Sequence, residues 1–138
     1  MENELTTHLM SDVAAFHEQV LEDFAEQSPS LISAEYCEER TAFLLEEVQE
    51  FMTSSRSGNL VGVADALADI IYVALGTAYK MGLPFDKIWG AVQAANMRKV
   101  KGPTKRGNKV DAMKPAGWVG PESEIARAIG RSLDHDAP

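Results

Sequence analysis

The sequence has 138 residues, of which 45% are hydrophobic and 25% charged, and its formal net charge is −8. These values are ordinary for a soluble globular protein of one domain, large enough to bury a core. The single cysteine, Cys37, excludes an internal disulfide and fits a reducing compartment, so we expect a cytoplasmic protein.

Charge is distributed unevenly along the chain. Residues 1–52 contain thirteen acidic residues and one basic residue, Arg40, whereas residues 98–114 contain seven basic residues and one acidic residue, Asp111. The first segment suits cations and the second suits anions, although charge runs usually form solvated faces.

The N-terminal part predicts a helix from about residue 8 to residue 27. Apolar residues recur there at helical spacing, and Ser28-Pro29-Ser30 ends the pattern. We expect His8 and His17 at the surface or at the edge of the core, since no metal-binding motif includes them.

A second helix is predicted from about residue 33 to residue 55, with Ser33 as its N-cap. On a helical wheel Glu46, Glu47 and Glu50 share one arc, with no Lys or Arg nearby on the helix to neutralise them. The apolar residues lie on a separate arc, where we expect Cys37 to be a small core residue.

The third predicted helix, residues 60–79 after the N-cap Asn59, is apolar on all sides and is therefore expected to be buried. It is long enough to span a bilayer, but Asp65 and Asp69 would each cost roughly 2.5–3.5 kcal/mol there, so we expect no membrane helix. The two carboxylates share one face. Unless they lie at a solvated edge, they need basic side chains, a shared proton or a metal ion as compensation.

A fourth helix follows the closing pair Met81-Gly82, opens at Pro84 and continues to about residue 97. Short turns join the second, third and fourth helices, so we expect antiparallel neighbours. No stretch has the period-two pattern of a sheet. The sequence thus predicts an all-α fold with a four-helix bundle-like core at about residues 8–100.

Residues 101–120 form a basic, turn-rich loop, in which Trp118 indicates partial order because a large aromatic side chain normally packs on something. A short helix is predicted from about residue 122 to residue 131. We expect one domain over residues 1–138, with the C-terminal helix and tail at 121–138.

Five carboxylates from the second and third helices are expected to converge: Glu46, Glu47, Glu50, Asp65 and Asp69. Hard cations such as Mg²⁺ prefer oxygen ligands, often together with substrate phosphates, and such a site suits hydrolysis of phosphate esters or phosphoanhydrides. The sequence lacks the Glu-x-x-His pairs of a di-iron site, the Cys and His cluster of a zinc site and a Gly-rich P-loop.

Several motifs together resemble one family. Residues 45–50, Leu-Glu-Glu-Val-Gln-Glu, are similar to the Glu-Glu-x-x-Glu half of the motif of all-α nucleoside triphosphate pyrophosphohydrolases. This superfamily includes MazG-like proteins, phosphoribosyl-ATP pyrophosphohydrolases and dimeric dUTPases. Residues 67–72 resemble the second half of the motif, and Gly82, residues 95–99 and a loop from Gly107 to Trp118 follow in order. The similarity covers about residues 35–120.

The resemblance implies Mg²⁺-dependent hydrolysis between the α- and β-phosphates of a nucleotide, with Mn²⁺ as a substitute, giving a monophosphate and pyrophosphate. Glu47, Glu50 and Asp69 would hold the metal, and Glu46 would ligate a second metal or orient the attacking water. Glu46 and Glu47 are therefore the catalytic candidates. The family has Glu three residues before its Asp, where this sequence has Ala, and Asp65 would substitute as ligand from one position earlier.

For substrate binding, the resemblance implies that Asn96 contacts the base or sugar and that three lysines neutralise the phosphates: Lys99, Lys109 and Lys114. It also implies a homodimer or a dimer of dimers, with sites near subunit interfaces. The biological role would be house-cleaning of damaged nucleotides or control of a nucleotide pool.

A different class of function is a small helical interaction protein whose basic residues 98–114 bind nucleic acid or an acidic partner. The acidic net charge argues against it, and it leaves the aspartate pair of the third helix unexplained. We therefore expect no nucleic-acid and no membrane partner.

Overall fold

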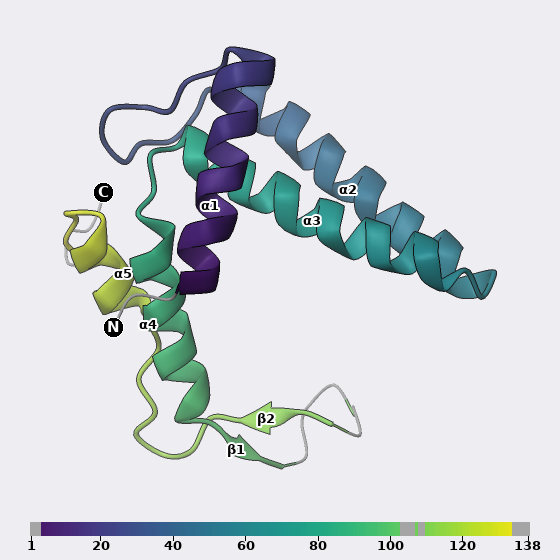
Figure 1. The fold of residues 1–138 in the computed structure, drawn as a ribbon. Coiled ribbons are helices and arrows are strands. Elements are labelled where there is room, and N and C mark those ends of the chain that lie inside the picture. Colours follow the sequence, from purple (N-terminus) through teal and green to yellow (C-terminus); the bar gives the residue numbers. More distant parts are fainter. Residues whose placement is uncertain (1–3, 103–106, 108–109, 134–138) are drawn as a thin grey trace. The chain divides into compact units, whose positions relative to one another are not determined.

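The computed structural model describes residues 4–102, 107 and 110–133 (Figure 1). Its elements in chain order are α1 (Glu4–Phe16), the π-helical turn η1 (His17–Leu21), α2 (Ala34–Arg56), α3 (Leu60–Lys80), α4 (Phe85–Met97), β1 (Val100–Lys101), β2 (Ala112–Met113) and α5 (Glu122–Ala128). The predicted all-α, bundle-like fold is confirmed. The described chain divides into two compact units at residue 85, and the single domain over residues 1–138 stays a prediction.

In the first unit, α1 and α2 both pack against α3, and α2 and α3 form a hairpin (Figure 1). Both predicted N-caps are confirmed. Ser33 Oγ accepts a hydrogen bond from the Tyr36 N–H at 3.1 Å, and Asn59 Oδ1 accepts one from the Gly62 N–H at 3.0 Å. Each cap satisfies an N–H group that the start of a helix leaves unpaired. The hairpin brings the acidic part of α2 beside the aspartates of α3.

The predicted end of the first helix near residue 27 is wrong. The helix continues through η1 only to Leu21, and Glu22 is left-handed with a φ of 52°. The next segment bonds to the end of α3 instead. Lys80 Nζ donates to the carbonyl of Phe24 at 2.8 Å, and the Glu26 N–H donates to the carbonyl of Lys80 at 3.1 Å. Because these bonds satisfy groups at the C-terminus of α3, tertiary contacts override the local helical pattern.

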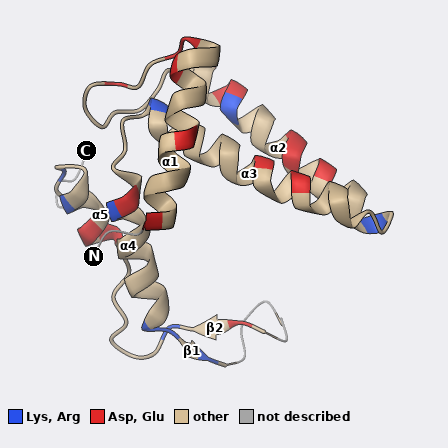
Figure 2. Cartoon of the chain, in the orientation of Figure 1, with Lys and Arg blue, Asp and Glu red and all other residues tan. Residues whose placement is uncertain are grey.

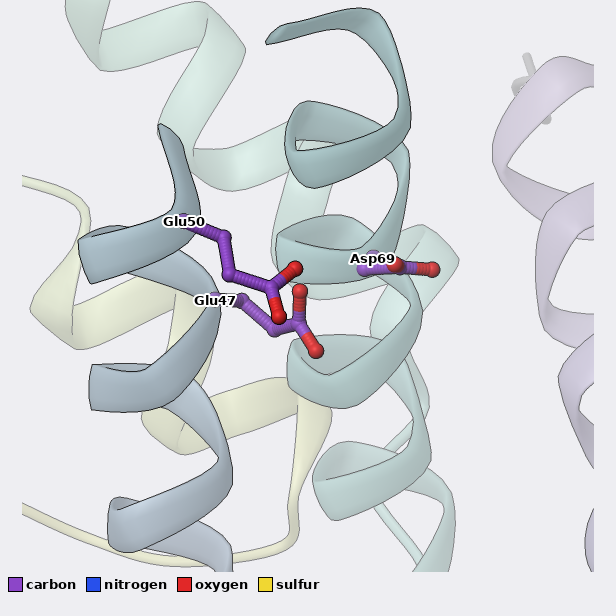
Figure 3. Close-up of side chains that lie close together, drawn as sticks. All are labelled: Glu47, Glu50 and Asp69. Atoms are coloured by element: carbon purple, nitrogen blue, oxygen red, sulfur yellow. The ribbon is translucent and has the colours of Figure 1, made fainter. Parts of the chain in front are cut away.

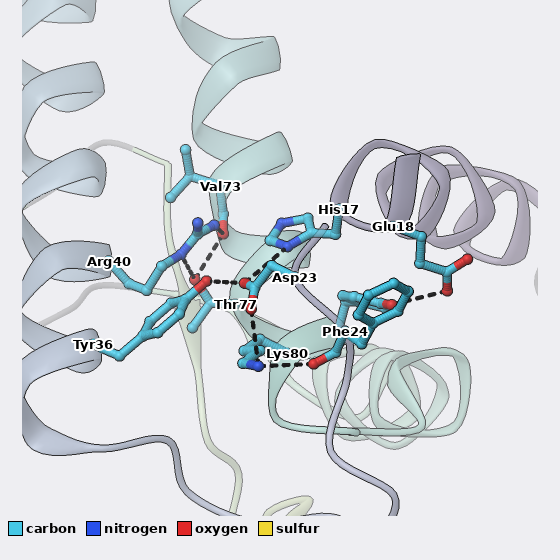
Figure 4. Close-up of polar contacts among 10 residues, drawn as sticks. His17, Glu18, Asp23, Phe24, Tyr36, Arg40, Val73, Thr77 and Lys80 are labelled. Atoms are coloured by element: carbon cyan, nitrogen blue, oxygen red, sulfur yellow. Dashed lines mark hydrogen bonds and ion pairs between the residues drawn. The ribbon is translucent and has the colours of Figure 1, made fainter. Parts of the chain in front are cut away.

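A polar network holds this segment against the hairpin (Figure 4). Asp23 pairs with Lys80 Nζ at 2.9 Å and accepts a hydrogen bond from the Tyr36 hydroxyl. Its other neighbour is His17, whose Nδ1 lies 3.6 Å from the Asp23 carboxylate. The His17 residue is only 2% exposed, so its expected place at the surface or the core edge is wrong, whereas His8 is exposed as expected.

Arg40 extends the network across the hairpin from α2 to α3. Its guanidinium donates to Thr77 Oγ1 and to the carbonyl of Val73, each at 2.9 Å. A Cβ at Gly76 would meet His17 Nε2 at 2.6 Å and Arg40 Nη2 at 2.8 Å. The missing side chain at Gly76 therefore makes room for both buried basic groups.

The second unit contains a short β-ladder that the sequence did not predict. Strands β1 and β2 are antiparallel, with Val100 opposite Met113 and Lys101 opposite Ala112. The expectation that no stretch forms a sheet is wrong at this place. Each strand has two residues, too few for an alternating pattern to be read.

Trp118 is ordered, as predicted, because its Nε1 donates to the carbonyl of Ala95 in α4 at 2.8 Å. The last helix, α5, ends at Ala128 rather than near residue 131, and Gly130 follows it with a φ of 73°. A left-handed glycine directly after a helix is a common C-terminal stop.

Much apolar surface of the first unit is exposed. Leu45 and Val48 on α2 are 60% and 47% exposed, and Leu67 and Ile71 on α3 are 46% and 50% exposed. The expectation that α3 is buried on all sides is therefore wrong for a single chain. Cys37 is also exposed, so its expected place in the core is wrong.

Helix α3 is the one helix in the described part of the chain that is long and apolar enough to cross a membrane. This is weak evidence, because the core helix of a soluble protein can have the same length and composition. Asp65 and Asp69 within α3 remain the physical argument against insertion.

Candidate metal centre

Three carboxylates meet where α2 and α3 run side by side (Figure 3). Glu47 and Glu50 come from α2 and Asp69 from α3, and one oxygen of each lies within 4.8 Å of the others. The two glutamates share a helix face because residues three apart are neighbours on it. Among the described residues, this is the one group of three or more His, Cys, Asp or Glu side chains close enough to hold one ion.

Glu47 is the least satisfied member of this carboxylate trio. Its Oε2 is buried and has no hydrogen-bond partner in the described part of the chain. Burial, followed by the charges of Glu50, Asp69 and Glu46, raises the pKa of Glu47 above its usual 4.5. A hydrogen bond with Glu50 acts in the same direction. The site therefore favours either a proton or a cation at this carboxyl.

The donor set fits a hard divalent cation. Three carboxylate oxygens are the ligands that Mg²⁺ prefers, and the unpartnered Oε2 of Glu47 is available to one. No Lys or Arg among the described residues forms an ion pair with the trio. Ion pairs with basic side chains are thus absent among the described residues, whereas a solvated edge, a shared proton and a metal ion remain, and Glu50 and Asp65 are both exposed.

The other two predicted carboxylates lie beside the trio rather than within it. Glu46 and Asp65, both exposed, line a neighbouring hollow of about 320 Å³, and Glu50 lines it as well. The structure thus brings together three of the five carboxylates directly and connects the other two through Glu50. Asp65 as a metal ligand stays a prediction.

Two of the three predicted phosphate-binding lysines lie close to the same aromatic ring. Lys99 Nζ lies 5.3 Å and Lys114 Nζ 5.0 Å from the centre of the Trp118 ring, within cation–π distance. Asn96 is exposed at the end of α4. Lys109 lies outside the described residues.

Sequence reasoning missed an apolar pocket between α1 and α3. It has a volume of about 200 Å³, and Leu9, Ile71 and Tyr72 are among its lining residues. Asp12 and Ala68 also line it, and Ala68 directly precedes Asp69 of the trio. The helical spacing of the apolar residues was visible in the sequence, but nothing there distinguishes a pocket from a filled core.

A family model described as phosphoribosyl-ATP pyrophosphohydrolase matches residues 13–96, more than half of the chain and a segment with all five carboxylates. The chain belongs to this family. The resemblance drawn from the motifs is therefore confirmed, and the protein is a hydrolase that acts on phosphoanhydrides. No curated protein was found to match the chain.

The phosphoribosyl-ATP pyrophosphohydrolase match ends at Asn96, so Lys99, Lys114 and Trp118 lie beyond it. The match therefore covers the segment with the carboxylates, and the roles of the individual site residues stay predictions. Such pyrophosphohydrolases are typically metal-dependent, and the carboxylate trio is where this one could hold an ion.

Proposed function

We propose that the protein is a Mg²⁺-dependent nucleoside triphosphate pyrophosphohydrolase that produces a nucleoside monophosphate and pyrophosphate. The observation that carries this proposal is the trio of Glu47, Glu50 and Asp69, with an unpartnered buried oxygen, inside the family-matched segment. A nucleotide is the substrate class that the family supports. We also propose that the reaction serves house-cleaning or nucleotide-pool control in the cytoplasm.

In this proposal Glu47, Glu50 and Asp69 hold Mg²⁺, or Mn²⁺ in its place. When bound, the metal supplies positive charge that neutralises the phosphate oxygens and lowers the pKa of a water. Glu46 orients the attacking water as general base or ligates a second ion, and Asp65 assists from the neighbouring hollow. Glu50 belongs to the trio and also lines the hollow, so it suits contact with both the metal and the groups in the hollow.

The remaining substrate contacts are proposed from the resemblance and from the charge of the side chains. Lys99, Lys109 and Lys114 neutralise the phosphate tail, and the position of two of them at the Trp118 ring supports a common role. Asn96 donates to or accepts from the base or sugar. The apolar pocket between α1 and α3 offers a surface for a flat base, with Tyr72 in its lining.

We further propose a homodimer, or a dimer of such dimers. The exposed apolar residues on both helices of the hairpin support it, because a second copy could cover them: Leu45, Val48, Met52, Leu67 and Ile71.

The test is product analysis over a panel of normal and modified nucleoside triphosphates, with Mg²⁺ or with EDTA. The proposal expects monophosphate and pyrophosphate in equal amounts, with Mg²⁺ only. Diphosphate and inorganic phosphate as products, or equal turnover in EDTA, would contradict it.

A further inference from the structure

A cationic groove lies between α4 and α5 of the second unit. Its volume is about 790 Å³, and Lys87, Arg98 and Arg127 all line it. This volume lies within the range of small-molecule sites, about 300–1,000 Å³. Figure 2 shows basic and acidic residues side by side on α5, and few charged residues on α4. In a chain of net charge −8, three cations around one groove with a single acid, Glu124, reverse the sign of the charge locally.

The wall of this cationic groove is held in place by hydrogen bonds. Arg98 Nη2 donates to the carbonyl of Val119 at 3.0 Å, and the neighbouring Trp118 is bonded to Ala95 at 2.8 Å. The floor is lined by small residues of α4: Gly90, Ala91 and Ala94. A ligand could therefore approach the α4 surface closely between the basic side chains.

The cations of the groove are only partly neutralised. Arg127 pairs with Glu124 at 3.1 Å, both side chains being exposed. Lys87 has no hydrogen bond or ion pair within the described residues, and Arg98 uses one of five N–H donors on Val119. Lys87 and Arg98 thus form no ion pair within the described residues, and the carboxylate of Glu122 lies beside Gly120 of the lining. The lining contains Ser123 as a further hydroxyl and no aromatic ring on which a base could stack.

We propose that this groove binds a multiply charged phosphate group, either free pyrophosphate or the phosphate tail of a nucleotide. Guanidinium groups bind phosphate oxygens in pairs of parallel hydrogen bonds, and Lys87 adds a point charge. The groove shares no residue with the carboxylate trio, and its residues from 98 onward lie beyond the family match. The assignment of this groove as a sensor of substrate or product, rather than a catalytic site, rests on the proposed function.

Calorimetric titration of inorganic pyrophosphate into the full chain tests this proposal. EDTA is present, so that no metal at the acidic trio recruits phosphate. We expect one site whose affinity falls with salt, and about tenfold weaker binding in Lys87→Gln and in Arg127→Gln, the scale of a lost charge-assisted hydrogen bond. Arg56→Gln, the same loss of charge on α2, should bind like the parent protein.

Further arms identify the ligand source and separate this site from the hydrolytic one. If a non-hydrolysable nucleotide binds more tightly than pyrophosphate, the groove recognises the nucleotide. If the two bind with equal affinity, the groove recognises the phosphate group alone. Asp69→Asn should keep the binding, so loss of hydrolysis leaves the proposal standing. Absent pyrophosphate binding, unchanged affinity in both groove variants, or binding of an oligonucleotide alone would overturn it.

Discussion

Glu47 links the protonation of a single side chain to the stability of the fold and to cation binding. Its pKa is raised by burial first and by three neighbouring carboxylates next. A raised folded-state pKa contributes stability below the unfolded value of about 4.5, and this contribution is lost as the pH rises through the folded pKa. A metal ion must displace the same proton, because carboxylate ligands bind in their ionised form.

We therefore expect Mg²⁺ to raise the melting temperature more strongly as the pH increases from about 4.5 towards neutrality. In Glu47→Gln the metal-free protein should be equally or more stable than the parent, and the stabilisation by Mg²⁺ should be lost. Melting curves with and without Mg²⁺ at several pH values measure both effects. A Mg²⁺ shift that does not change with pH would show that Glu47 is not a ligand.

The carboxylates of this site and their convergence could be predicted from the sequence, whereas the distances between them could not. Glu47, Glu50 and Asp69 follow from helical spacing and from a short hairpin. The position of Asp65 in the neighbouring hollow depends on how the two helices are rotated against each other. A helical wheel fixes the direction of a side chain on its own helix only. The sequence could therefore not show whether Asp65 reaches the place of the family's glutamate, where this chain has Ala66.

At the scale of elements, the C-terminal end of α3 holds the segment after η1 through polar groups that are half-buried or exposed, beside the buried His17. His17 is the histidine of this network, and its pKa is shifted by its surroundings. Burial, then the charge of Arg40, lowers its pKa below 6.5, while Asp23 acts in the opposite direction. A lowered folded-state pKa gives stability above pH 6.5 that is lost as the pH falls through the folded value.

We accordingly expect the free energy of unfolding to decrease as the pH falls below about 6.5, in chemical denaturation series between about pH 5 and pH 7. His17→Gln should reduce this pH dependence, because the group that titrates is absent. The exposed His8→Gln is the matched control and should keep it. Equal slopes for the parent protein and His17→Gln would contradict the assignment.

Gly76 allows a packing test of the same network. Alanine usually favours a helix over glycine by about 1 kcal/mol, but here its Cβ would lie 2.6 Å from His17 Nε2 and 2.8 Å from Arg40 Nη2. We expect Gly76→Ala to destabilise the protein by about 1–3 kcal/mol, as in other overpacked sites. Gly90→Ala in α4 has no heavy atom within 4 Å and should be neutral or stabilising. Urea denaturation of both variants decides the point.

Helix ends that depend on hydrogen bonds within a few residues could be predicted. Helix and strand ends that depend on contacts with residues far away in the sequence could not. The caps Ser33 and Asn59 define α2 and α3 through their own hydrogen bonds. The early end of the first helix depends on contacts of Asp23 and Phe24 with Lys80, more than fifty residues away. Likewise, the short β-ladder rests on pairing across a loop whose sequence contains no strand pattern.

At the scale of the molecule, the exposed apolar surface of the hairpin supports the proposed dimer. Leu45 and Val48 on α2 face solvent in the single chain, although they belong to the apolar arc of that helix. We expect light scattering to give about twice the chain mass of 15.1 kDa, or four times for a dimer of dimers. Val48→Glu should shift the mass towards that of one chain, whereas Glu39→Gln should not.

This expectation can be separated from misfolding. Because Val48 is 47% exposed in the single chain, a folded monomer should accept the charge, and circular dichroism should stay helical. A mass near 15.1 kDa for the parent protein at micromolar concentration would contradict the dimer.

Asp69 is the contribution of α3 to the carboxylate trio, and the proposed metal centre depends on it most directly. The measurement is Mg²⁺-dependent pyrophosphate release by Asp69→Asn beside its melting curves with and without Mg²⁺, with Glu39→Gln on α2 as control. We expect metal-free Asp69→Asn to be as stable as the parent protein or more stable, since the trio loses one repelling charge. The variant should lose turnover and the rise in melting temperature that Mg²⁺ gives, whereas Glu39→Gln should keep both. An Asp69→Asn protein that unfolds without metal, yet hydrolyses nucleotide in proportion to its folded fraction, would contradict the metal centre.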